Sequence, residues 1–310
     1  MFKTKLQIAI DLMDRALKNG VRVAHWTFDE FYGRDSKFPD ELDDRNQRFV
    51  CEIPRKTRVW TAEPRVIVDG VTADSQDTTD SSEVVKNRTP CEVQSLLRHS
   101  IKFLTQSWQH YRIKDTDKGP EVWKIKHLTV WRQTSHGPPK RCTLIVARNV
   151  RTNETKFFFA SGVVGERGVT LRGLLRVAFG RRGIEAELRV GKEELGMDHF
   201  EVRGWRCIHR HYYVTALSFL LCSRIRRSLD DQKDPGTLTI EQVRRSINCW
   251  LQYSHLPPHL RDAEFQKELD NQRYYQQRNA QARASHTITR KKLYRQLGID
   301  VDKIKSCIQI

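Results

Sequence analysis

The first 53 residues alternate between the periodicities of helix and strand, and this alternation limits the folds that the chain can adopt. Four apolar residues repeat at helical spacing before Gly20, namely Leu6, Ile10, Met13 and Leu17. The pattern then predicts a strand over residues 21–28, a helix near 36–46 and a strand over 48–53. Two parallel strands are too few for a sheet that helices cover on its faces. The sequence therefore predicts an α/β core whose open edge lacks neighbouring strands.

The middle of the chain has the pattern of short strands. An alternating pattern covers residues 122–130, a continuous apolar run covers 142–147, and a third strand pattern covers 155–160. The sequence Arg-Thr-Asn-Glu before the third strand predicts a hairpin connection. Residues 73–83 are polar and acidic, which is typical of an exposed linker. We therefore predict an α+β chain of four segments: part of the core (1–60), a linker and β-rich insertion (61–170), further core helices (171–228) and a helical basic tail (229–310).

The composition favours a globular protein with a polyanionic partner. Hydrophobic residues make up 38% of the 310 residues, and the formal net charge is +17. The longest apolar run, residues 214–222, is far below the ~20 residues that a membrane-spanning helix needs. The N-terminal residues lack a secretory pattern. We expect a cytoplasmic protein that does not act at a membrane.

The cysteines and histidines do not have the spacing of a metal centre. The seven cysteines include no Cys-x2-Cys pair, so we expect free, mostly buried thiols and no structural zinc site. His209 and His211 lie two residues apart and would diverge on a helix. We expect them to pack or to contact phosphate.

A charged stretch near residue 185 has a more specific pattern. At helical spacing, Arg181, Glu185, Arg189 and Lys192 share one face, whereas Glu187 points the opposite way. The adjacent apolar stripe, which we expect to pack on a sheet, consists of Ile184, Leu188, Gly191 and Leu195. A solvated charged helix is the alternative interpretation of these residues.

The spacing Arg181-x3-Glu185-x6-Lys192 resembles the last catalytic block of bacterial insertion-sequence transposases of the DDE superfamily, in the group with the signature Y-x2-R-x3-E-x6-K. The similarity covers residues 179–211. Residues 9–33 and 47–54 are similar to the block around the second catalytic aspartate of this family, which corresponds to Asp29. Further similarity at 273–283 extends the resemblance over nearly the whole chain. The sequence departs from the signature at Ala178, where the family has tyrosine, and at Arg182, where tryptophan is usual.

The resemblance implies a ribonuclease-H-like core that cleaves and joins DNA at transposon ends. Asp29 and Glu185 would be the catalytic residues and ligands of two Mg²⁺ (or Mn²⁺) ions, which prefer hard oxygen ligands. Arg181, Arg189 and Lys192 would contact DNA phosphates. A homodimer associated with the bacterial nucleoid is also implied.

The family's first catalytic aspartate belongs to a segment that would precede Met1. The chain is therefore expected to be an N-terminally truncated, inactive copy, or one whose start codon was wrongly assigned. Asp11 and Asp14 are expected to face solvent on the first helix, so they do not replace this carboxylate.

The C-terminal region supplies a second set of candidate DNA contacts. Residues 271–299 contain seven Lys or Arg, no Asp or Glu, and three tyrosines that could stack on bases. The alternative is a helical tail whose charges are only solvated. The residues that we expect to bind DNA here are Arg273, Arg278, Arg283, Arg290, Lys291 and Lys292.

Two other functions are compatible with parts of the pattern. In a non-catalytic nucleic-acid-binding protein, Asp29 and Glu185 would be ordinary structural acids. An unrelated hydrolase could use Asp29 with a histidine, but the sequence contains no Gly-x-Ser-x-Gly turn for a nucleophile.

Overall fold

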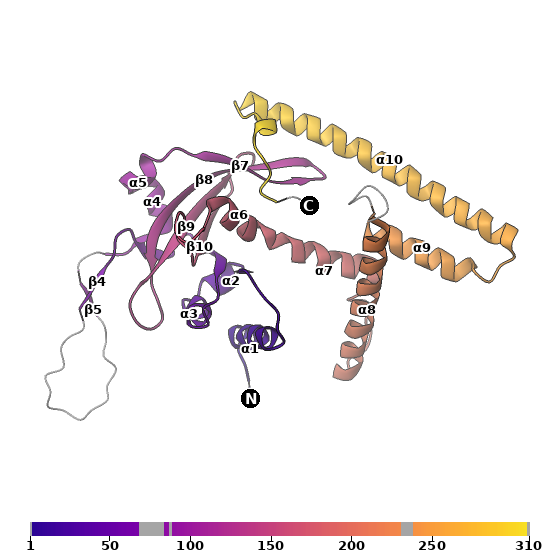
Figure 1. The fold of residues 1–310 in the computed structure, drawn as a ribbon, viewed down its shortest axis with the longest axis horizontal. Helices are drawn as coiled ribbons and strands as arrows, with labels where there is room; N and C mark the ends of the chain where they lie inside the picture. The colour runs from indigo at the N-terminus through magenta and orange to yellow at the C-terminus, as the bar shows by residue number, and fades with distance from the viewer. Residues whose placement is uncertain (1, 68–83, 87–88, 231–237, 309–310) are drawn as a thin grey trace. The chain divides into compact units, whose positions relative to one another are not determined.

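The computed structural model describes residues 2–67, 84–86, 89–230 and 238–308 (Figure 1). The chain divides into two compact units. The sheet unit comprises residues 1–115, 120–181 and 298–309, and the helical unit comprises residues 116–119, 182–297 and 310. Residues 73–83, for which the sequence predicts a linker, lie outside the described residues.

A sheet of eight strands organises the sheet unit. Its path is β1-β2-β10-β9-β8-β3-β6, and β7 pairs with β8 beside this path. β1 and β2 are parallel, whereas β2, β10, β9 and β8 are antiparallel to one another in turn. A separate two-stranded sheet is formed by β4 (Arg65–Ile67) and β5 (Val84–Lys86). The strands of the large sheet are β1 (Trp26–Phe28), β2 (Phe49–Ile53), β3 (Arg58–Trp60), β6 (Cys91–Glu92), β7 (Gln109–Thr116), β8 (Gly119–Arg132), β9 (Lys140–Asn149) and β10 (Thr155–Ala160).

The strands of the predicted β-rich insertion continue the sheet that β1 and β2 begin. β10 lies along β2, with Phe157 opposite Ile53 and Ala160 opposite Val50. The Phe49 backbone N–H donates to Ser161 Oγ over 2.9 Å, which ties the end of β10 to the start of β2. The strands that extend the sheet beyond the parallel β1–β2 pair therefore all lie on the β2 side. β1 is the edge strand of the described sheet.

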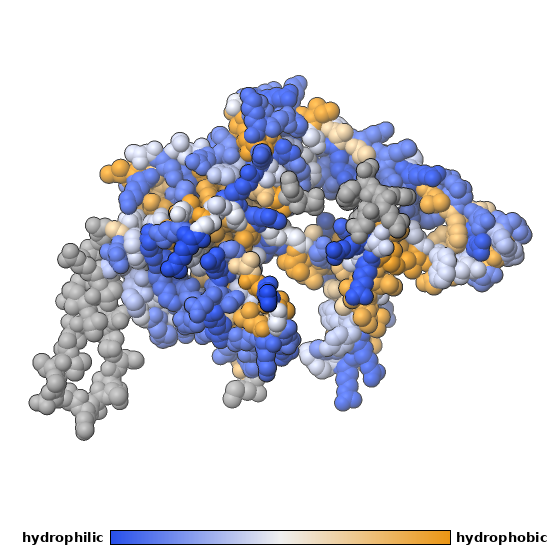
Figure 2. All heavy atoms as spheres, viewed as in Figure 1, coloured by the Kyte–Doolittle hydropathy of each residue, from blue (hydrophilic) through white to orange (hydrophobic). Residues whose placement is uncertain are grey.

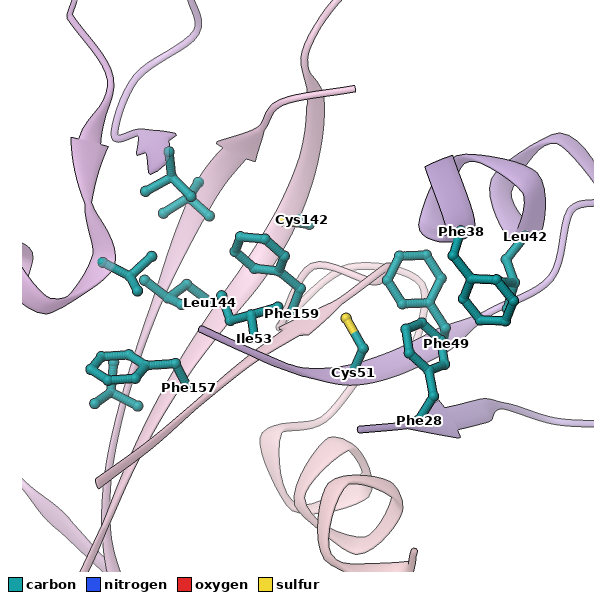
Figure 3. Close-up of a cluster of buried hydrophobic side chains, with 14 of the residues drawn as sticks. Phe28, Phe38, Leu42, Phe49, Cys51, Ile53, Cys142, Leu144, Phe157 and Phe159 are labelled. Carbon is teal, nitrogen blue, oxygen red and sulfur yellow. The ribbon is translucent and has the colours of Figure 1, made fainter. Parts of the chain in front are cut away.

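Both faces of the central strands are buried, which explains their continuous apolar sequences. Alternate residues of β2, β9 and β10 point to opposite faces, as the strand period requires. Cys51, Leu144 and Phe159 belong to one core cluster, whereas Val50 and Ile145 belong to the other. Figure 3 shows the first cluster, in which the rings of Phe28, Phe38 and Phe49 gather beside Cys51.

Helices contribute to both of these clusters. α1 (Lys5–Lys18) and α3 (Lys37–Asp44) contribute to the first, and α6 (Leu171–Gly180) contributes to the second. α1 begins with a capping box in which the side chains of Thr4 and Gln7 each bond the other's backbone N–H. The remaining helices of the sheet unit are α2 (Glu30–Gly33), α4 (Val93–His99), α5 (Ile101–Leu104) and the 3-10 helix η1 (Val301–Lys303).

The helical unit has a much smaller core. Its helices are α7 (Arg182–Leu195), α8 (Trp205–Asp230), α9 (Ile240–Tyr253) and α10 (Pro258–Gln296). Cys222, Ile240 and Val243 are buried, and partly buried apolar residues of α7 to α9 surround them. Ion pairs add to this packing: Arg244 contacts Glu194 at 3.0 Å, and Arg245 contacts Glu268 at 2.9 Å.

The expected packing of the stripe beside Glu185 is corrected by the structure. Ile184 and Leu188 are exposed, and α7 instead packs against α8 and α9 through Val190 and Leu195. The helix that covers the sheet is α6, and the centroid of its Phe179 ring lies 4.9 Å from that of the Trp123 ring. The stripe was misassigned because a helix can bury an apolar face equally well against other helices.

Most of the predicted elements are confirmed. The helix ending before Gly20, the helix near 36–46 and the strands at 48–53, 122–130, 142–147 and 155–160 all occur. The hairpin before β10 is also present: Asn149 Oδ1 accepts from the backbone N–H of Arg151 and Thr152, and Asn153 has φ 56°. The strand expected over 21–28 is limited to β1, three residues long. The mixed α+β class is confirmed.

Candidate functional site

Asp29 lies at the point where the edge strand β1 ends and α2 begins. Its Oδ1 accepts hydrogen bonds from the backbone N–H groups of Phe31 (3.1 Å) and Tyr32 (3.4 Å), so Asp29 is the N-cap of this short helix. The residue is half-buried. The carboxylate is therefore held in a fixed orientation at the carboxyl end of a strand.

An aromatic cluster beneath Asp29 holds α2 in place. The Phe28 ring meets the Phe38 ring edge-on, with 4.9 Å between the ring centroids. The centroid of the Tyr32 ring lies 5.1 Å from that of Phe38. Trp26 and Tyr32 are partly buried and pack against the first core cluster. A Cβ on Gly33 would lie 2.1 Å from the backbone oxygen of Glu52, so only glycine allows α2 to approach β2 this closely.

The carboxyl ends of β1 and β2 lie at the same edge of the sheet because the two strands are parallel. Asp29 follows β1 at this edge, and the segment that begins at Pro54 follows β2. In open parallel α/β sheets, ligands bind outside the carboxyl ends of the strands. The parallel β1–β2 pair makes the end of the sheet that carries Asp29 a candidate location for a binding site by this rule.

The charged face near residue 185 is divided at a helix junction. Arg181 is the C-cap residue of α6 and closes the sheet unit, whereas Glu185 lies in the first turn of α7 in the helical unit. Glu185, Arg189 and Lys192 are exposed. Arg181 and Glu185 each take part in intramolecular interactions, and Arg189 Nε lies 4.0 Å from a Glu193 carboxylate oxygen. Because Asp29 and Glu185 belong to different units, their convergence at one site stays a prediction.

The described residues do not form a complete metal site. No group of three His, Cys, Asp or Glu side chains suited to a metal ion occurs among them. Acids close in sequence to the strand ends have other contacts: Glu30 lies 3.7 Å from Arg34, and Glu52 pairs with Lys156 at 2.6 Å. Asp29 supplies oxygen of the kind that Mg²⁺ prefers, but a two-ion site needs more carboxylates than this one.

The predicted basic tail is helical, and several of its cations already have intramolecular contacts. Arg278 donates to the Tyr274 hydroxyl over 3.1 Å, and Arg273 lies 3.5 Å from Asp270. Arg283 lies 3.7 Å from Asp117, and Arg290 donates to the backbone oxygen of Gly119 over 3.1 Å. Arg290 therefore holds the turn between β7 and β8, whatever its role toward DNA.

Other side chains of α10 are exposed to solvent. Lys292 is exposed, and Tyr274 and Tyr275 are about half-exposed with ring centroids 5.4 Å apart. The Arg278 guanidinium lies 5.8 Å from the centroid of the Tyr274 ring, whereas Lys292 lies several turns further along the helix. An aromatic ring beside a cation suits the stacking and charge neutralisation that single-stranded nucleic acid requires.

The buried ion cluster around Arg132 was not anticipated from the sequence. The Arg132 guanidinium lies 2.6 Å from Asp40 and also contacts Asp43, both on α3. Burial lowers the pKa of Arg132, but the charges of Asp43 and Asp40 and their hydrogen bonds outweigh it, so the pKa is raised. The one available sequence signal was the Asp-x2-Asp spacing, which puts two acids on one side of the helix.

The remaining site expectations concern the cysteines, the histidines and the first helix. All seven cysteines are free thiols, and four of them are buried. His211 Nε2 lies 2.8 Å from the backbone oxygen of Gly196, and the His209 ring lies 4.1 Å from the Trp205 ring, so both histidines pack as expected. Asp11 and Asp14 are largely solvent-facing and pair with Lys3 and Arg45.

Residues 1–120 match the model of a family described as DDE superfamily endonuclease. This match supports a transposase-like protein of the DDE superfamily, and it includes Asp29 and the edge formed by β1 and β2. It does not extend to Glu185 or Lys192. No curated protein and no solved structure matches the chain.

Among the helices that the structure describes, none has the length and apolar character needed to cross a membrane.

Proposed function

We propose that this chain is a copy of an insertion-sequence transposase, a class of enzyme that cleaves and transfers DNA strands with divalent metal ions. The observation that carries the proposal is the family match over residues 1–120, because it contains a fixed carboxylate, Asp29, at the carboxyl edge of a sheet. The net charge of +17 supports a polyanionic substrate. Endonucleases of the DDE superfamily generally use divalent metal ions.

The proposed site combines Asp29 with Glu185. The two carboxylates would be metal ligands, and Arg181, Arg189 and Lys192 would neutralise phosphates on either side of the reacting bond. When bound, the divalent ions would activate the attacking oxygen and stabilise the leaving oxygen. The parallel β1–β2 pair, the helices beside it and the edge position of β1 support an incomplete ribonuclease-H-like core as the fold of this region.

The proposed site lacks the third carboxylate of a two-ion centre. Such a centre holds its ions through shared carboxylates, and the described residues include no group of three suitable side chains. We therefore expect this chain by itself to bind DNA without cutting it.

The proposal can be tested through the metal dependence of DNA binding, because this measurement does not require a complete active site. DNA affinity should rise when Ca²⁺, which shares the oxygen preference of Mg²⁺, is added to the wild-type protein. Asp29→Asn and Glu185→Gln should each abolish this rise and leave metal-free binding unchanged. Glu187→Gln, on the opposite face of α7, is the matched control and should behave as wild type.

A non-catalytic nucleic-acid-binding protein is the second candidate. It is favoured by the capping role of Asp29, which accounts for this carboxylate without any metal. In that case Ca²⁺ would not change DNA affinity, and none of the three amide substitutions would alter the response to metal.

A further inference from the structure

A cavity with basic walls lies in the sheet unit, at the sheet edge that carries Asp29. Its volume is about 520 Å³, which lies within the usual range of small-ligand pockets. One wall is the end of α2 with Gly33 and the following Arg34, and a second is the segment from the end of β2 to the start of β3, with Lys56 and Arg58. Arg132, at the end of β8, forms a third wall. The cavity therefore opens where β2 ends, beside the short helix that Asp29 caps.

The charge of these walls is entirely positive. Among the described residues that line the cavity, four are cations and none is an acid. The charge of Arg132 is balanced by Asp40 and Asp43, and Arg34 lies 3.7 Å from Glu30. The side chains of Lys56 and Arg58 make no ion pair or hydrogen bond with any residue that the structure describes. These two cations are therefore available to a bound anion.

The walls are held by backbone contacts rather than by the charged side chains. The backbone N–H of Val93 donates to Thr57 O over 2.9 Å, and that of Gln94 donates to Arg55 O over 3.1 Å. On the opposite wall, the close approach of Gly33 to the backbone oxygen of Glu52 fixes α2 against β2. A pocket fixed in this way orders few groups when a ligand binds, which favours affinity.

We propose that this basic cavity binds the phosphate groups of a DNA strand beside Asp29. Lys56 and Arg58 would make the direct contacts, and Arg132 would form the third wall from within its ion cluster. The inference rests on the proposed function for the identity of the anion, since free phosphate has the same charge chemistry. Because the cavity lies at the end of the sheet that carries Asp29, a strand bound there would run beside this proposed metal ligand.

The salt dependence of DNA binding tests this proposal. The slope of log affinity against log salt is negative, and each lost phosphate contact reduces its magnitude by about 0.7 to 0.9. The Lys56→Ala/Arg58→Ala double variant should therefore reduce the magnitude of this slope by about 1.5. Arg55→Ala is the matched control, because Arg55 is exposed in the same segment but does not line the cavity. The proposal is wrong if the control variant reduces the magnitude of the slope as much as the double variant does.

Chemical modification of lysines locates the bound strand and distinguishes DNA from free phosphate. A single-stranded oligonucleotide should protect Lys56 from an amine-reactive reagent, and it should leave the exposed Lys102 of α5 reactive. Inorganic phosphate should protect Lys56 only at far higher phosphate concentration. Protection by phosphate alone, or no protection by either probe, would overturn the proposal.

The same experiment on Asp29→Asn separates this inference from the proposed metal chemistry. We expect Lys56 to stay protected by DNA in this variant, because the cavity does not use the carboxylate. If Ca²⁺ has no effect on DNA affinity but Lys56 is protected, the metal proposal fails while the phosphate cavity stands. If protection is lost in Asp29→Asn, binding in the cavity depends on the metal site and the independent cavity proposed here is refuted.

Discussion

The sheet unit and the helical unit differ in how they are stabilised. In the sheet unit, two apolar clusters bury both faces of β2, β9 and β10. In the helical unit, one cluster contains three buried residues, and much of α8 is exposed. Figure 2 shows apolar residues gathered on the surface of the region formed by the helical unit. A strand needs neighbours for its backbone hydrogen bonds, whereas a helix satisfies most of its own.

This difference explains why long helices can extend with little packing. α10 is 39 residues long, and Tyr294 is its one fully buried residue in the described structure. The exposed apolar residues of α8 include Tyr213, Leu217 and Leu221. We therefore expect the free energy of unfolding to depend strongly on single side chains in the sheet unit and weakly on most of those in α8.

The largest expected effect is the loss of an aromatic ring from the sheet unit. Phe49 is fully buried in β2 and contacts the Phe28 ring at 5.8 Å. Phe49→Ala should lower the free energy of unfolding by about 3–5 kcal/mol, because it leaves a cavity in a packed core. Leu217→Ala is the control in the helical unit: Leu217 is 65% exposed, so its loss should cost less than about 0.5 kcal/mol. Similar losses of unfolding free energy for Phe49→Ala and Leu217→Ala, measured by denaturant unfolding, would contradict this difference between the two units.

The buried ion cluster should give the next effect. Arg132 is 3% exposed and balances Asp40 and Asp43. Arg132→Ala should cost about 3 kcal/mol, near the lower end for a broken buried pair, since Lys140 still lies 3.5 Å from Asp43. The control is Arg141→Ala, which removes an exposed pair with Glu166 and should cost less than about 1 kcal/mol. Equal losses of stability for Arg132→Ala and Arg141→Ala, measured by thermal unfolding, would show that burial does not determine how much these ion pairs stabilise the protein.

The smallest effect concerns an ion pair of the helical unit at low pH. Burial raises the pKa of Glu268, but hydrogen bonds from Gln272 and Arg245 and the Arg245 charge more than offset it, so the pKa is lowered from 4.5. The interactions of ionised Glu268 therefore stabilise the protein above about pH 4.5, and this stabilisation is lost as the pH falls through the lowered pKa. Glu268→Gln should lose about 1 kcal/mol or less at pH 7 and show a weaker acid dependence of helix content. An unchanged acid dependence, measured by circular dichroism, would contradict this assignment.

Local patterns predicted the elements well, and contacts between distant residues were the main source of error. The continuous apolar run in β9 identified a strand because both of its faces are buried. β1 was predicted too long because residues 21–25 lack a hydrogen-bonded neighbour that would define a strand. The sequence did not indicate whether the stripe on α7 packs against the sheet or against other helices, since both require the same period.

For the candidate site too, some local features were predictable from the sequence and the contacts between distant residues were not. The end of a strand just before Asp29 was predicted from local sequence and is confirmed, but the short helix α2 that Asp29 caps was not predicted. The contacts of Arg132 with Asp40 join residues more than 90 positions apart, and the basic cavity joins three separate segments. No local periodicity encodes such contacts, so they required the fold.

The most direct test of the proposed active site is cross-linking between its two carboxylate positions. In a background without reactive cysteines, Asp29→Cys/Glu185→Cys should be joined efficiently by a linker of about 8 Å, twice the spacing of a two-ion site. Asp29→Cys/Glu187→Cys, whose second cysteine faces the opposite side of α7, should be joined far less. Equal yields for the two pairs, or linkage only by much longer reagents, would contradict a site shared by Asp29 and Glu185.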